Sequence, residues 1–191
     1  MITTLPTKLT LAAFLAQPET KPASEFIDGT VTQKPMPGGE HSLLQGELCT
    51  TINQVTEPQK LAYAFPELRC TFGGASIVPD VTVFRWDRIP RQPSGRIVNR
   101  FKLHPDWTIE FLSPHQSRTK VERNILHCLE HDTQMGWLLD PDDASVRSFL
   151  PNREPIVFSD PDAILPVPTW LSSANANFQL TLATLFGWLS L

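Results

Sequence analysis

The chain has 191 residues, enough for one domain that buries its own hydrophobic core. Its formal net charge of −4 at pH 7 counts against strong general affinity for nucleic acid, which depends on cationic contacts to phosphate. Three widely spaced cysteines favour reduced thiols over a disulfide framework, and the N-terminal segment is typical of neither a signal peptide nor a spanning helix. We expect a soluble, cytoplasmic protein with no membrane partner. A single domain is expected over residues 1–191, with residues 1–20 as an N-terminal helical extension.

The first half of the chain predicts two helices and several strands. A short helix is expected over residues 10–16, and the turn residues Asp28 and Gly29 predict a hairpin within EFIDGTVTQKP. Helical spacing of leucine and isoleucine predicts a longer helix over residues 41–52. Proline and paired glycines then separate strands that are predicted over residues 61–65, 68–72 and 77–85.

The second half predicts a strand over residues 107–112, a helix over residues 117–131 and a strand at GWLLD. This order is typical of a crossover unit with parallel strands. SVRSFL alternates like a half-buried strand, and FQLTLATLFGWL predicts an amphipathic C-terminal helix. The pattern favours a mixed α/β domain.

Two isolated carboxylates, Asp80 and Glu110, lie in otherwise apolar, strand-like segments. A buried carboxylate must end a strand, pair with a cation or bind a metal, because uncompensated charge is costly in the interior. The simplest role of Asp80 is to bond nearby backbone amides, and that of Glu110 is to pair with a loop arginine. If their strands are neighbours, the two acids can instead converge on one Mg²⁺ or Mn²⁺ ion.

The helix that follows Glu110 presents a polar stripe formed by Lys120, Asn124, His127 and His131. Lys120 lies in the first turn, nearest the end of the Glu110 strand, and is our candidate for a third catalytic residue. A solvated lysine is the alternative. The two histidines have the spacing of a zinc-binding pair, but the residue after the first one is Cys128 and not the glutamate of metalloproteases.

Positive charge is concentrated in the proline-containing segment 87–105. Such a composition is typical of an exposed loop, and exposed loops often carry binding residues. We expect Arg96, Arg100 and Lys102 to contact nucleic acid; the alternative is ordinary solvated charge.

Taken together, EFIDGTVTQKP, GGEH, VPDVTVF, IEFLSP and GWLLDP occur in an order that resembles the Uma2 family of bacterial restriction endonucleases. The resemblance runs from about residue 25 to residue 140. It implies a restriction-endonuclease-like PD-(D/E)xK fold, in which helices flank a central mixed sheet. It also implies Asp80 and Glu110 as metal ligands, with Glu25, His41 and Asn124 as candidate accessory residues.

The chain departs from the nuclease motif in its lysine. The simple motif has a lysine two residues after the acid, where this chain has Leu112. The family usually moves that lysine to the following helix, and its commonest position falls on Asn124, one turn after Lys120. The resemblance therefore leaves open whether the site is active.

Three hypotheses follow. The leading one is a Mg²⁺- or Mn²⁺-dependent endonuclease acting on DNA, with a homodimer expected because cutting a duplex commonly needs two active sites. The second is a weakened or inactive nuclease fold that serves as a DNA- or protein-binding module, which Asn124 favours. The third is a structural module whose carboxylates make only internal hydrogen bonds.

Overall fold

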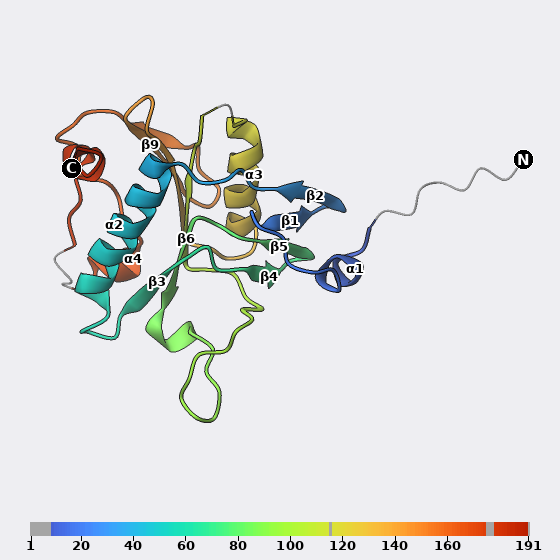
Figure 1. Cartoon of the computed structure of the whole chain (residues 1–191). Coiled ribbons are helices and arrows are strands. Elements are labelled where there is room, and N and C mark those ends of the chain that lie inside the picture. The colour runs from blue at the N-terminus through green and yellow to red at the C-terminus, as the bar shows by residue number, and fades with distance from the viewer. Residues whose placement is uncertain (1–8, 115, 175–177, 191) are drawn as a thin grey trace, which may run out of the picture.

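The computed structural model describes residues 9–114, 116–174 and 178–190 (Figure 1). Within these residues the helices are α1 (Leu11–Leu15), α2 (Gly39–Thr56), α3 (Arg118–Leu129), α4 (Thr169–Ser172) and α5 (Leu182–Gly187), with a short 3-10 helix at Trp86–Arg88. The strands are β1 (Ser24–Ile27), β2 (Thr30–Gln33), β3 (Ala62–Pro66), β4 (Cys70–Phe72), β5 (Ala75–Ile77), β6 (Val81–Arg85), β7 (Trp107–Phe111), β8 (Met135–Asp140), β9 (Ser145–Phe149) and β10 (Ile156–Phe158).

The strands form two sheets. The larger sheet has six strands in the order β10-β9-β8-β7-β6-β3, and the smaller has four in the order β2-β1-β5-β4. β7 and β8 are parallel and the other pairs are antiparallel, so the larger sheet is mixed. The predicted crossover unit is confirmed as β7–α3–β8, and the predicted mixed α/β fold is confirmed with it.

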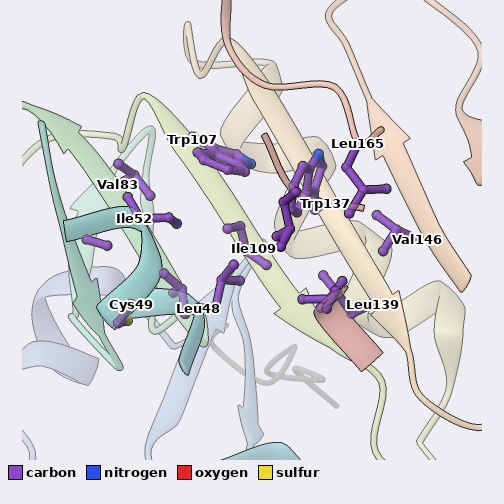
Figure 2. Packing of buried hydrophobic residues seen from close by; sticks show 14 of the residues in the cluster. Leu48, Cys49, Ile52, Val83, Trp107, Ile109, Trp137, Leu139, Val146 and Leu165 are labelled. Carbon is purple, nitrogen blue, oxygen red and sulfur yellow. The ribbon is translucent and has the colours of Figure 1, made fainter. Parts of the chain in front are cut away.

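The larger sheet lies between helices α2 and α3 (Figure 1). Alternate residues of its central strands face α2, and Figure 2 shows Trp107 and Ile109 near Leu48 and Ile52 of the helix, with Trp137 of the same core beside Leu165. The intervening residues face α3, whose Val121 and Ile125 pack with Leu138 of β8. Glu110 of β7 therefore points to the α3 side.

Helix α3 lies close to the sheet over Gly136 of β8. A Cβ atom at this glycine would lie 2.2 Å from Cγ2 of Ile125, well inside normal contact distance. The absence of a side chain at Gly136 thus lets α3 come close to the sheet.

The structure differs from the predicted elements in two places. The strand predicted over residues 77–85 is divided, because the chain leaves the smaller sheet after β5 and enters the larger sheet at β6. Pro79 lies in the gap and has no amide hydrogen for a sheet. The helix predicted at residues 178–189 is shorter, since Thr181 caps α5 by accepting a hydrogen bond from the amide of Thr184.

The N-terminal helix is confirmed as α1, which Thr10 caps through its side-chain oxygen. Residues 1–8 of the expected extension over residues 1–20 lie outside the described residues. No described helix is both long and apolar enough to cross a membrane.

Candidate active site

The two carboxylates singled out in the sequence lie on neighbouring strands. Asp80 directly precedes β6 and Glu110 lies in β7, and these strands pair with Val81 opposite Ile109. Both side chains are almost inaccessible, with Asp80 1% and Glu110 2% exposed. The condition for the two acids to converge, that β6 and β7 are neighbours, is met.

A lysine that the sequence did not single out contacts both acids. Nζ of Lys34, which follows β2, lies 2.6 Å from Oδ1 of Asp80 and 3.4 Å from Oε2 of Glu110. The same amine donates to the carbonyl of Val78 at 2.7 Å. Lys34 therefore bridges the two carboxylates.

Backbone and helix α2 fix Asp80 from its other sides. Its Oδ2 accepts a hydrogen bond from the amide of Phe111 at 2.8 Å, and its carbonyl accepts one from Gln45 Nε2 at 2.6 Å. His41, one turn before Gln45, places Nε2 3.3 Å from Oδ1 of Asp80. Among the described residues that ring nitrogen has no hydrogen-bond partner, although it is buried.

Two further predicted residues, Glu25 and Asn124, join the cluster behind Glu110. Nδ2 of Asn124 donates to Oε2 of Glu25 at 2.9 Å and to Oε1 of Glu110 at 3.2 Å. The other oxygen of Glu25 accepts from the amide of Val78 at 2.7 Å. Asn124 thus orients two carboxylates that come from different sheets.

Burial and neighbouring charges shift the pKa values of Lys34, Asp80 and Glu110 away from their usual values. Burial lowers the pKa of Lys34, but Asp80, Glu110 and Glu25 raise it more, so the pKa lies above its usual value. For Asp80, burial is outweighed by Lys34 and His41, which hold the pKa well below its usual range. Burial raises the pKa of Glu110 well above its usual value despite Lys34, and Asp80 and Glu25 act in the same direction as burial. The cluster holds its negative charge most firmly at Asp80.

A cavity of about 360 Å³ opens beside these groups between the β1–β2 hairpin and the start of α3. Glu25, Glu110 and Asn124 line it, together with Lys34 and Lys120. Lys120 is exposed, and within the described residues the basic side chains that contact Asp80 and Glu110 are those of Lys34 and His41. The structure thus places Lys120 in the same cavity as Glu110, while Lys34 makes the direct contacts.

A family model and a solved structure match this chain. A family model described as "Putative restriction endonuclease", Uma2, matches residues 11–182. The chain belongs to the Uma2 family. Its structure is also similar to the crystal structure of "a putative nuclease belonging to DUF820" from Anabaena variabilis, at 55% sequence identity and a TM-score of 0.90. That match covers 95% of this chain and 99% of the other, whereas a comparison with curated proteins finds no match.

Within this Uma2 domain the basic loop lies away from the acids. It connects the end of β6 to the start of β7, whereas Asp80 precedes β6 and Glu110 lies near the end of β7. The loop is the green segment at the bottom of Figure 1. Arg96, Arg100 and Lys102 are exposed there. The structure therefore places these three predicted contacts at the opposite end of the strands from the candidate site.

The histidine pair of the Uma2 domain also lies apart from the acids. His127 Nε2 bonds the carbonyl of Phe72 at 3.3 Å, and His131 Nδ1 bonds the carbonyl of His127 at 2.8 Å. Among the described residues, no three histidine, cysteine, aspartate or glutamate side chains gather closely enough to hold a metal by themselves. A metal in this domain would therefore need ligands beyond such a trio.

Proposed function

We propose that the chain is a divalent-metal-dependent endonuclease that hydrolyses phosphodiester bonds of DNA. The observation that carries this proposal is the pair of buried carboxylates, one directly before β6 and one in β7, bridged by a lysine at the edge of a polar cavity. Membership in a family of restriction endonucleases and the likeness to a nuclease structure support it.

The donor set fits Mg²⁺ or Mn²⁺. Mg²⁺ is commonly held by one or two carboxylates, with waters and substrate phosphate completing its shell, so a trio of acidic ligands is not required. Asp80 and Glu110 would hold the ion. The buried Nε2 of His41, which has no hydrogen-bond partner among the described residues, is what a site that gains another ligand would leave. Once bound, the metal would polarise the phosphate and favour an attacking hydroxide.

The residues of the chain supply the remaining functions. The Phe111 amide and the Asn124 side chain orient the two metal-binding carboxylates. Lys120 and Lys34 line the cavity and would place positive charge near the phosphate, whose charge increases in the transition state. Lys34 would thus be a lysine beside Asp80 and Glu110, although position 124 is asparagine.

Cleavage of plasmid DNA tests the proposal. Asp80→Asn and Glu110→Gln keep the size of each side chain but remove its charge, and loss of a metal ligand is expected to lower the rate at least about a thousandfold. Asp106→Asn is the matched control, because Asp106 is equally buried and pairs with Arg88 at 2.7 Å at the other end of β7. Equal rates for the wild type and the folded Asp80→Asn protein would rule out the proposed site.

A second candidate function is a DNA-binding module without catalysis, and the neutral Asn124 at the family's lysine position favours it. Calorimetry with Mg²⁺ or Mn²⁺ separates the two. Binding that depends on both Asp80 and Glu110, together with cleavage, supports the nuclease. DNA binding without metal binding or cleavage supports the module.

A further inference from the structure

The amine of Lys34 lies where a metal shared by the two acids would bind. Its two carboxylate contacts are Oδ1 of Asp80 and Oε2 of Glu110. The other two oxygens already accept hydrogen bonds from the Phe111 amide and from Asn124. A cation that bridges Asp80 and Glu110 would therefore use the same pair of oxygens that Lys34 holds.

Lys34 also stands between Asp80 and the open cavity. The cavity of about 360 Å³ is lined by Lys34 and Glu110, whereas Asp80 lines a separate space of about 10 Å³ together with Lys34 and His41. That smaller space holds about one water molecule, too little for a hydrated divalent ion. Lys34 lines both spaces, so a metal that comes from the larger cavity meets the lysine side chain before Asp80.

The surroundings of Lys34 allow its side chain to withdraw. Lysine carries its charge on a flexible four-carbon stem, and the side chain of Lys34 lines the cavity into which it would withdraw. The residue follows β2, and the next residues, Pro35, Met36 and Pro37, are exposed. Withdrawal breaks the contacts of Lys34 with Asp80, Glu110 and the carbonyl of Val78.

We propose that Lys34 is an internal substitute for the metal: its ammonium group occupies the position between Asp80 and Glu110 in the metal-free protein and withdraws into the cavity when a divalent ion binds. This inference rests on the proposed metal site. The lysine then screens two buried carboxylates from each other until the metal replaces it, and metal affinity is reduced by the contacts that must first be broken.

Binding of Mn²⁺ alone, measured by calorimetry without DNA, tests the inference. Lys34→Met removes the competing charge and keeps the length of the side chain. Mn²⁺ then no longer has to break the hydrogen bonds of Lys34 to the carboxylates, so it should bind about 10- to 100-fold more tightly, the change in affinity that hydrogen bonds to charged groups usually produce. Lys120→Met is the matched control, since it removes the same charge from the same cavity without touching the acids. The Mn²⁺ affinity of Lys120→Met should stay within about threefold of the wild-type affinity, because removal of one exposed charge changes binding only slightly.

Thermal unfolding provides a second readout. Without metal, Lys34→Met leaves Asp80 and Glu110 without their cation and should unfold at a lower temperature than the wild type, and saturating Mn²⁺ should raise its melting temperature more than that of the wild type. Lys34→Gln, which can still donate to Asp80, should show the same direction of change and replaces Lys34→Met if that variant does not fold.

Three results decide the matter. Tighter Mn²⁺ binding by the Lys34 variants, with unchanged binding by Lys120→Met, supports the substitute role. Equal or weaker binding by the Lys34 variants, when the wild type does bind Mn²⁺, overturns it and leaves the proposed metal site intact. If neither the wild type nor a Lys34 variant binds Mn²⁺, the metal site and this inference both fall.

Discussion

The contact between Gly136 and helix α3 gives a stability prediction with a defined sign. A Cβ at Gly136 would lie 2.2 Å from Ile125 Cγ2, about 1.2 Å short of the 3.4 Å at which ordinary contact begins. Gly136→Ala must therefore push α3 away from β8. Overpacking of this kind costs about 1–3 kcal/mol, and the entropic gain of replacing glycine returns less than about 1 kcal/mol. We expect a net loss of about 1–2 kcal/mol in the free energy of unfolding.

Urea denaturation measures this change, and Gly46→Ala is its control. Gly46 lies inside α2 with open space within 4 Å of the position that a Cβ would take, so the same substitution there should stabilise the protein by about 0.5–1 kcal/mol through helix propensity. Asn124 directly precedes Ile125, so Gly136→Ala should also slow cleavage. A Gly136→Ala protein as stable as the wild type would refute the argument from close approach.

Three other predictions concern separate parts of the molecule. Asn53→Ala removes both hydrogen bonds to the backbone of Ala64 on edge strand β3, and urea denaturation should show a loss of about 1–3 kcal/mol in the free energy of unfolding. Gln54→Ala, on the exposed side of α2, is the control and should change that free energy by less than about 0.5 kcal/mol. Asn124→Ala should lower the cleavage rate about 10- to 100-fold by releasing Glu110, and an unchanged rate would mean that Glu110 needs no such support. Replacing Arg96, Arg100 and Lys102 by glutamine should reduce the slope of log binding constant against log salt by about 0.9 per lost phosphate contact; an unchanged slope would remove the loop from the DNA interface.

The sequence was sufficient to predict β7, which carries Glu110, and the strand that begins directly after Asp80. Each acid interrupts an apolar segment, and the strand–helix–strand order after Glu110 predicted the parallel pair β7–β8. The exact position of Asp80 could not be predicted, because the chain changes sheets around it and local propensity does not reveal such a crossing. Pro79 was the visible signal of that break.

The contact of Lys34 with both acids was missed because it is entirely non-local. Lys34 is 46 residues from Asp80 and 76 residues from Glu110 in the sequence. A signal did exist in the hairpin, whose register pairs Glu25 with Thr32. Alternation then predicts that Lys34, two residues further on, faces the same side as Glu25.

The basic loop shows the opposite case, in which residues close in sequence are not close in space. It lies between Asp80 and Glu110 along the chain. Since β6 and β7 are antiparallel, both ends of their direct connection lie at the end of the strand pair that is farther from Asp80 and Glu110. Pairing direction, which the sequence does not reveal, therefore decides which charges can reach a substrate.

The cluster of acids also lies at the contact between the two sheets. Glu25 comes from the smaller sheet and Glu110 from the larger sheet, and Asn124 of α3 donates hydrogen bonds to both. Lys34, which follows the β1–β2 hairpin, adds an ion pair to Glu110. A ligand that contacts residues of both sheets binds only the form in which the sheets pack against each other. Its binding free energy therefore stabilises that form against separation of the sheets. Hydrogen exchange of the β1 and β2 amides should therefore slow when the site is occupied, which makes the hairpin a reporter of an event at the acids.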